Sequence, residues 1–265
     1  MIMNSNRLRT QMAFEQMYNG IESEQWQRLK KRNILDRKIT SEEAERFKET
    51  LEGDSKDFYF KGLLSLIEAL SNIKNGLYSW ATVKLYYSTY YLLRCSLTSK
   101  EVAVVRHKRE LFYIRCNENE KFKQPSMNQD HQAIIDISVK LFAEDDKLQS
   151  NLINDENSYE WLKDRREAVN YKSREFLEPV CPAFFTEISE NIKNSGIELL
   201  VKRIIEDAYI LTFQEEYAII AIPLKRFLLT KETMLANGID ISLSKEKLEV
   251  LTKLLPKNTI QILTQ

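Results

Sequence analysis

Residues 77–97 read LYSWATVKLYYSTYYLLRCSL, and this stretch gives the strongest indication of the fold class. Apolar and aromatic side chains lie around nearly the whole circumference of a helix drawn through it, so the stretch predicts a helix buried at the centre of a bundle. Tyr87 with Tyr91, and Tyr86 with Tyr90, are four residues apart and are expected to stack on two neighbouring faces. We expect these rings to form an aromatic core; the alternative is that they line a ligand pocket.

Other helices are predicted around this central one. Thr40 or Ser41 can begin a helix that Gly53 ends, and Asn75 and Gly76 can end the next one. A last helix is expected to be capped by Ser242 or Ser244. The ranges with helical spacing are 57–74, 130–145, 159–178, 183–208 and 243–255.

Two segments break the helical period. Residues 100–128 alternate apolar and polar side chains around LFYIRC, which predicts a short hairpin inserted between helices. In AYILTFQEEYAIIAIPLKRFLL the period also shifts toward two, so we expect a second hairpin that turns at Glu215 and Glu216, with Pro223 at an edge or end. The fold class predicted is mainly α, a helical bundle with an inserted hairpin and a small mixed α/β element at the C-terminal end.

The composition excludes several classes of protein. The chain has 265 residues with only 6 glycines and 5 prolines, which favours helices over disorder. Its 39 basic and 39 acidic residues give a net charge of zero, so any contact with nucleic acid has to come from a local patch. The start of the chain lacks the apolar core of a signal peptide, and no apolar run is long enough for a membrane span. We therefore expect a cytoplasmic protein that does not act at a membrane.

Common motifs of nucleotide, zinc and hydrolase chemistry are absent from the sequence. The three cysteines, Cys95, Cys116 and Cys181, form no CxxC pair and are expected to be reduced thiols. Only His107 and His131 could carry proton transfer as imidazoles; a solvated basic turn and a helix start are the simpler interpretations of the two. We expect no metal and no cofactor.

The helix predicted for residues 159–178 contains WLKDRREAVNY, at Trp161–Tyr171. Together with the earlier YYSTYYLLR, this pattern resembles the HEPN superfamily of helical bundles over residues 57–205. The nuclease members of that superfamily pair an Arg with a His four to six residues later, and two such helices meet across a dimer to cleave RNA. By this resemblance Arg165 matches the Arg and Arg166 its polar follower, whereas Asn170 stands where the His would be.

The substitution of Asn170 for His removes the proton carrier, because an amide neither accepts nor releases a proton near neutral pH. The motif therefore favours a protein without enzymatic activity, unless a histidine from elsewhere in the fold completes the site. On a helix Arg166 and Asn170 share a face. One interpretation is that Arg166 pairs with a buried acid and orients the helices; the other is that it belongs to a dimer or RNA surface.

A second, weaker similarity, over residues 77–130, is to the YaaC-like bacterial proteins, which have no assigned activity. The helical spacing, the change of period after residue 209 and the resemblance together divide the chain into peripheral helices at 1–56, a HEPN-like bundle at 57–208 and the mixed element at 209–265.

The segment 100–123 is the most basic candidate for RNA binding. It has seven basic residues against four acidic ones, and aromatic residues interleave with them, as in proteins that stack unpaired bases. An ordinary hairpin with one packed face and one solvated face has the same pattern. The RNA-binding candidates are Arg106, His107, Lys108, Arg109 and Tyr113.

Three function classes follow. The first is a non-catalytic interaction or accessory protein, bound to a protein partner or to a second copy. HEPN-like proteins without a complete motif are found in bacterial anti-phage and toxin–antitoxin systems, which the resemblance implies here. The second is a metal-independent ribonuclease toxin with a divergent site of Arg165, Arg166, Asn170 and Tyr171. The third is a small-ligand sensor that uses the tyrosine-rich interior.

Overall fold

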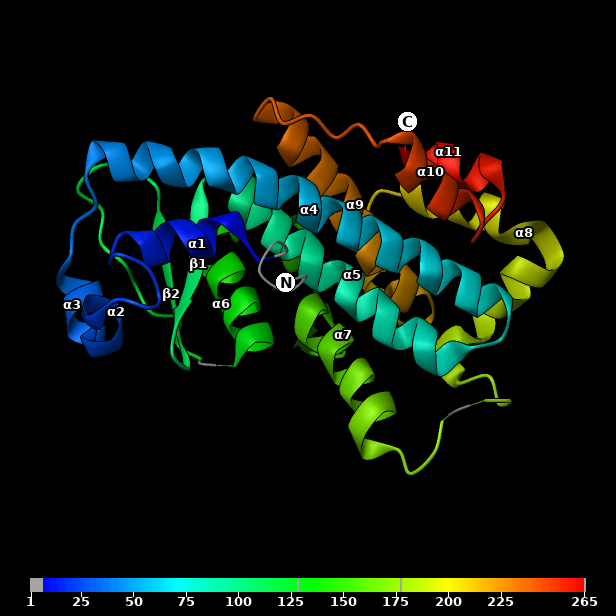
Figure 1. Ribbon diagram of the computed structural model, residues 1–265. Helices are drawn as coiled ribbons and strands as arrows, with labels where there is room; N and C mark the ends of the chain where they lie inside the picture. The colour runs from blue at the N-terminus through cyan, green and yellow to red at the C-terminus, as the bar shows by residue number, and fades with distance from the viewer. Residues whose placement is uncertain (1–6, 128, 177, 265) are drawn as a thin grey trace. The chain divides into compact units, whose positions relative to one another are not determined.

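The computed structural model describes residues 7–264, apart from 128 and 177 (Figure 1). It is mainly helical, with 67% of the chain in helix, 11 α-helices in the described part and a small two-stranded sheet. This confirms the mainly α class and the inserted hairpin. The α-helices are α1 (Arg9–Gln16), α2 (Glu24–Arg28), α3 (Lys31–Asp36), α4 (Ser41–Lys74), α5 (Tyr78–Ser99), α6 (Asp130–Phe142), α7 (Ser158–Glu167), α8 (Thr186–Glu206), α9 (Glu215–Ala236), α10 (Lys245–Thr252) and α11 (Lys257–Thr264).

The chain divides into two compact units. The first unit comprises Met1–Phe58, Leu93–Leu141 and Thr233–Asp240, and the second unit comprises Tyr59–Leu92, Phe142–Glu232 and Ile241–Gln265. Strands β1 (Val102–His107) and β2 (Glu110–Arg115) belong to the first unit, and the two-residue strands β3 (Leu152–Ile153) and β4 (Glu156–Asn157) belong to the second.

The β1–β2 hairpin and the N-terminal helices enclose the core of the first unit. The strands pair antiparallel from Val102↔Arg115 to His107↔Glu110, and Lys108 with a φ of 54° helps to close the turn. The buried side chains of this core come from α1, α3, α4, the hairpin and the segments next to these elements: Ala13, Phe14, Tyr18, Leu29, Ile34, Ile39, Ala44, Phe47, Leu51, Ala103, Val105, Phe112, Ile114, Cys116 and Phe122.

Polar contacts fix α1 on this unit. Its first turn has no side-chain cap of its own, and the buried carboxylate of Asp54 accepts the backbone N–H groups of Arg9 and Thr10, both at 3.0 Å. A carboxylate at this end also suits the helix dipole. The Gln11 amide donates to Arg106 O at 2.9 Å and accepts from Arg106 N at 2.8 Å, so it occupies an edge of β1 as a paired strand would.

The prediction that Gly53 ends a helix is wrong, because α4 runs through it for 34 residues. Phe47, Leu51 and Phe58 keep one face of the helix buried on both sides of the glycine. Glycine costs only about 1 kcal/mol in a helix, which burial of such side chains exceeds.

The second unit is built on α4, α5 and α9. Ser88 donates to Gly62 O at 2.9 Å, the rings of Tyr59 and Phe227 stack at 5.6 Å, and Thr230 donates to Leu92 O at 3.3 Å. The predicted central role of residues 77–97 is thus confirmed for the part of α5 in this unit. Tyr78, Tyr86 and Tyr90 are its buried tyrosines.

The predicted strands after residue 209 are wrong, since 215–236 form α9 and the described residues from there to 264 contain only helices and loops. Every side chain from Ala218 to Leu224 is fully buried. A continuous apolar run has the same hydrophobic pattern whether it forms a buried strand or a buried helix. The period of its apolar residues therefore could not distinguish the two structures. Pro223 lies inside α9 and not at the edge or end of a strand, as the sequence had predicted.

Other helix ends also differ from the prediction. The helix predicted for 159–178 is α7, followed by one π-helical turn at Ala168–Lys172. In α8 Gly196 has a φ of 82°, which glycine adopts readily, and it kinks the helix that was predicted to be continuous. Ser244 caps α10 as expected, but the predicted last helix is two, α10 and α11.

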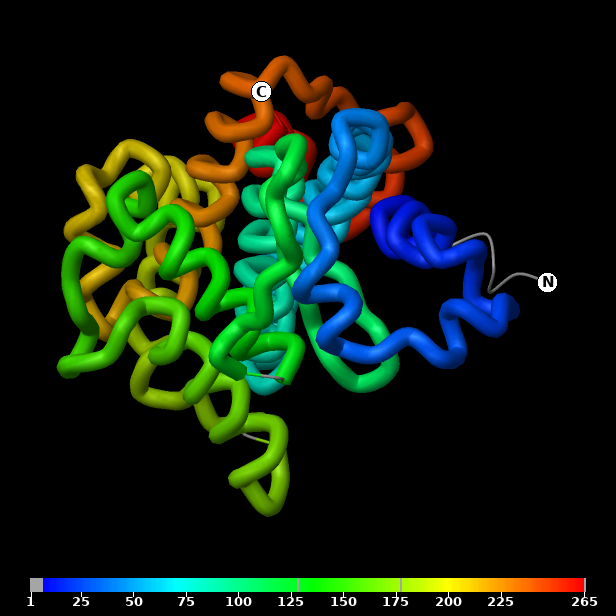
Figure 2. The backbone as a smooth tube through the Cα atoms, turned by 90° about the vertical axis from the view of Figure 1, so that its left-hand side faces the viewer, coloured from blue at the N-terminus to red at the C-terminus, as the bar shows by residue number. Residues whose placement is uncertain are grey.

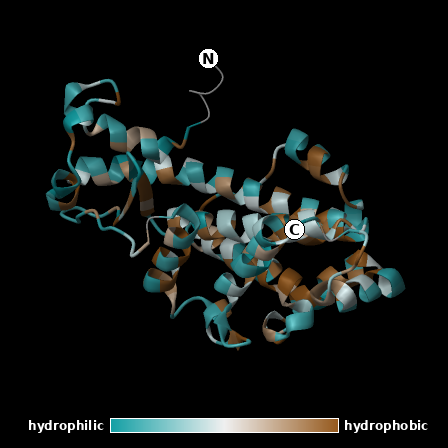
Figure 3. Cartoon of the chain, turned by 90° about the horizontal axis from the view of Figure 1, so that it is seen from below, coloured by the Kyte–Doolittle hydropathy of each residue, from teal (hydrophilic) through white to brown (hydrophobic). Residues whose placement is uncertain are grey.

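No described helix is long and apolar enough to cross a membrane. Figure 3 shows hydrophilic and hydrophobic residues interspersed along the helices. In the first unit, Figure 2 shows the tip of the β1–β2 hairpin next to the chain of α2 and α3. The His107 side chain at this tip contacts Leu29 O, which follows α2.

Candidate functional site

Helix α7 places the motif residues of the second unit. Its N-cap Asn157 accepts the N–H of Tyr159 at 3.0 Å, and Trp161 and Leu162 are fully buried. Residues four apart share a helix face. Arg166 therefore lies on the same buried face as Leu162, and Arg165 lies next to Trp161 at the edge of that face.

The guanidinium of Arg166 is enclosed by tyrosines. It lies 5.2 Å from the ring centre of Tyr86, 5.8 Å from that of Tyr87 and 4.9 Å from that of Tyr171, and Arg166 is 7% exposed. Its Nη2 donates to the hydroxyl of Tyr171 at 3.4 Å. Cations over aromatic faces gain about 2 kcal/mol when desolvated, which helps to offset burial of the charge.

The tyrosine rings stand where we expected an acid. Within the described residues no carboxylate pairs with Arg166, so the predicted buried ion pair is wrong. Burial is the largest effect on the pKa of Arg166 and opposes the charged form, but the hydrogen bond to Tyr87 and the electrostatic contributions of Tyr171, Tyr87 and Tyr86 together outweigh burial and raise the pKa of the guanidinium. Burial also raises the pKa of Tyr86, so its ring stays neutral. The same rings were candidates for a ligand pocket, and Arg166 fills the space between them.

Of the other three motif residues, only Tyr171 contacts Arg166. Arg165 lies over the Trp161 ring at 4.8 Å and pairs with Glu215 at 3.5 Å. Asn170 is exposed on the π-helical turn, and Tyr171 is 68% exposed although its ring covers Arg166. The structure therefore brings Arg166 and Tyr171 together and leaves Arg165 and Asn170 apart from them.

Neither histidine belongs to the unit that holds the motif. His107 and His131 both lie in the first unit, whereas Arg165, Arg166 and Asn170 lie in the second. His107 was expected on a solvated turn, but it is 4% exposed, with Nε2 at 3.1 Å from Leu29 O. Burial lowers its pKa.

Most of the predicted RNA-binding residues are engaged within the first unit. Arg106 pairs with Asp130, Tyr113 is 8% exposed, and its backbone N–H donates to Lys123 O at 2.9 Å. Phe112 and Phe122 are in the core, so the prediction that hairpin aromatics stack on bases is wrong for these two. Of the five candidates, only Lys108 and Arg109 are exposed at the tip of the hairpin.

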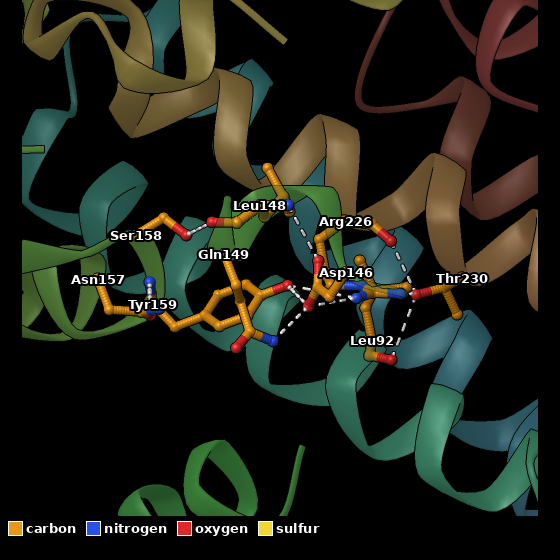
Figure 4. Close-up of polar contacts among 9 residues, drawn as sticks. All are labelled: Leu92, Asp146, Leu148, Gln149, Asn157, Ser158, Tyr159, Arg226 and Thr230. Carbon is orange, nitrogen blue, oxygen red and sulfur yellow. Dashed lines mark hydrogen bonds and ion pairs between the residues drawn. The ribbon is translucent and has the colours of Figure 1, made fainter. Parts of the chain in front are cut away.

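A buried polar network in the second unit was missed by the sequence analysis (Figure 4). Asp146 Oδ2 accepts from Arg226 Nη1 at 3.1 Å, from the Tyr159 hydroxyl and from the Gln149 amide, and Asp146 Oδ1 accepts the Leu148 N–H. Arg226 Nη1 also donates to the Tyr159 hydroxyl at 3.2 Å, and its Nε donates to Thr230.

This network is closed to solvent. Asp146, Tyr159 and Arg226 are each at most 5% exposed, and the charges of Asp146 and Arg226 balance. Burial and the charge of Asp146 raise the pKa of Tyr159 well above its ordinary value. With no access for a substrate, the arrangement joins the segment before α7 to α9. The signal in the sequence was the pair Lys225 and Arg226 inside an otherwise apolar run.

In the described part of the chain, no group of three or more His, Cys, Asp or Glu side chains is placed to hold a metal ion. No known protein family, no curated protein and no solved structure matches this chain.

Proposed function

We propose that this chain is a non-catalytic interaction protein with a HEPN-like helical body, an accessory part of a bacterial anti-phage or toxin–antitoxin system. The observation that carries the proposal is the enclosure of Arg166 by Tyr86, Tyr87 and Tyr171. A guanidinium held in this way stabilises the bundle and is not free to bind a phosphate. Asn170, exposed on the π-helical turn, supplies no proton carrier.

An exposed aromatic pair supports binding to a protein. Trp80 and Phe176 are 49% and 55% exposed, and their ring centres lie 5.7 Å apart. Both oxygens of Glu178 accept hydrogen bonds from Ser79 at 2.7 Å, which holds this segment against the start of α5. Exposed aromatic clusters mark interaction surfaces, and tryptophan is enriched where binding energy is concentrated.

A ribonuclease assay tests the absence of chemistry. Purified protein is incubated with single-stranded and with structured RNA, without added metal, and we expect no cleavage. Cleavage that disappears in Arg165→Ala or Asn170→Ala would contradict the proposal and restore the divergent nuclease.

Mass measurement tests the interaction. The native mass is determined for the chain alone and co-expressed with its neighbouring genes, and we expect a complex with a partner or with a second copy. Trp80→Ser with Phe176→Ser should abolish that complex. Leu199→Ser with Ile210→Ser is the matched control, because these residues are 56% and 61% exposed in the same unit. A monomeric mass under every condition would contradict the proposal.

A further inference from the structure

Six exposed cations of the first unit come from two distant parts of the sequence. We call them the basic rim: Arg28, Lys30, Lys31, Arg32, Lys108 and Arg109. Four belong to the end of α2 and the start of α3, and two form the tip of the β1–β2 hairpin. The sequence alone showed only the hairpin part.

Buried contacts hold the two parts together. His107 Nε2 lies 3.1 Å from Leu29 O, and the His107 ring meets the Trp26 ring edge-on at 4.6 Å. Lys31 also pairs with Glu110 at 3.7 Å, beside the hairpin tip. Since His107 precedes Lys108 and Leu29 precedes Lys30, these contacts bring the cations of both segments onto neighbouring stretches of backbone (Figure 2).

The charge of this region is far from neutral. Residues 28–38 and 106–110 contain nine basic residues and two acidic ones. Arg28, Lys31 and Arg32 have exposed acidic partners, which are worth little in water. Lys30, Lys108 and Arg109 have no acidic partner in the part of the chain that the structure describes. Seven acidic residues of this unit lie on the first half of α4, whereas Glu24, Glu110 and Asp36 lie beside the basic rim: the seven are Glu42, Glu43, Glu45, Glu49, Glu52, Asp54 and Asp57.

The positive region continues past α3. Lys38 lies directly opposite Lys121 in an antiparallel bridge, and both side chains are exposed. Like charges in this position repel each other. Lys38 follows the last residue of α3 by two positions, so this pair continues the series of cations along the chain.

We propose that the basic rim binds the phosphate backbone of a nucleic acid strand without reading its sequence. Phosphates neutralise cations that have no partner within the protein, and the released counterions drive the association. Lysine is depleted from protein–protein interfaces, which favours a nucleic acid over a protein on this surface. The hairpin aromatics Phe112 and Phe122 are in the core, so they add no base contacts. The inference stands independently of the proposed interaction function.

Fluorescence anisotropy of the full chain with labelled single strands of RNA and DNA tests this. We expect binding in roughly the micromolar range at low salt that weakens steeply as salt rises. The variant Lys30→Gln with Lys108→Gln and Arg109→Gln should bind at least about tenfold more weakly. It should also lower the slope of log Kobs against log salt by about 2, because each phosphate contact to a single strand contributes about 0.7.

The matched control removes the same charge from the second unit: Lys193→Gln with Lys253→Gln and Lys257→Gln, three exposed lysines. It should bind like the unmodified chain. Circular dichroism confirms that both variants are folded. Equal losses in the two variants, or no binding to either strand at low salt, would overturn the inference. Sedimentation with phosphatidylserine vesicles tests a lipid surface as the source of the phosphates. Binding to these vesicles without binding to either strand would also overturn the inference.

Discussion

Arg166 keeps its charge in the interior because tyrosine faces surround it. The sequence indicated that Arg166 lies on the helix face it shares with Asn170. Which residues contact the guanidinium depended on how α5 packs against α7. Spacing within one helix cannot specify a contact between two helices, so an acid was as reasonable an expectation as an aromatic cage.

Replacing Arg166 by Ala should lower the free energy of unfolding by about 2–3 kcal/mol, because it removes the cation from three rings and leaves a cavity. Urea denaturation measures the loss. Arg166→Lys should recover only part of it, since an ammonium lacks the planar guanidinium that stacks on rings.

Arg165→Ala is the control for this prediction, because the Arg165 side chain is 32% exposed and its ion pair with Glu215 lies at the surface. We expect it to cost less than about 1 kcal/mol. An equal loss in both variants would mean that the tyrosine cage does not stabilise the fold.

His107 should make stability depend on pH. Burial lowers its folded pKa below the unfolded value of 6.5, and Lys108 acts in the same direction while the hydrogen bond to Leu29 and the charge of Glu110 oppose it. The unfolded chain therefore binds more protons in this window, so stability is full above about pH 6.5 and declines as the pH falls.

Thermal unfolding at pH 7.5 and pH 5.5 checks this expectation. The melting temperature should fall on acidification in the unmodified chain, and the fall should be smaller in His107→Gln, whose amide does not titrate. An identical fall in both proteins would assign the effect to other groups.

At the scale of elements, helix α4 combines two glycines with opposite roles. A Cβ at Gly62 would lie 2.6 Å from Leu92 Cγ, whereas a Cβ at Gly53 would meet only the flexible Arg9 side chain at 3.0 Å. The first glycine lets α4 and α5 approach each other closely. The second is tolerated in the helix without being required.

Gly62→Ala should therefore destabilise the chain by about 1–3 kcal/mol through overpacking. Gly53→Ala should be neutral or stabilise it by up to about 1 kcal/mol, because alanine is the better helix former and arginine can move aside. Chemical denaturation of the two variants under the same conditions measures both changes in the free energy of unfolding. A stabilising Gly62→Ala would mean that the helices are not in close contact there.

At the scale of the whole molecule, the network of Asp146, Tyr159 and Arg226 joins residues 80 positions apart. Arg226→Met leaves a buried carboxylate without its counter-ion, so it should lower the free energy of unfolding by about 3–5 kcal/mol. The double variant Asp146→Leu with Arg226→Met should be less damaged than the sum of the single variants, because it leaves no uncompensated charge.

The surface pair Lys202 with Glu198 provides the comparison, since these side chains are 47% and 38% exposed. Lys202→Met should change stability by less than about 1 kcal/mol. If Arg226→Met is equally mild, the buried pair contributes little to the fold.

By itself the sequence determined that the chain is mainly helical, that residues 77–97 form a buried helix and that a hairpin follows it, because local spacing and turn residues carry that information. It also determined that residue 170 is an asparagine, whose amide neither accepts nor releases a proton near neutral pH. Only the tertiary structure decided that 215–236 is helical, that tyrosines enclose Arg166 and that His107 joins two basic segments. A fully buried run has no polar side to reveal its period, and contacts such as that of His107 with Leu29 depend on how distant segments pack.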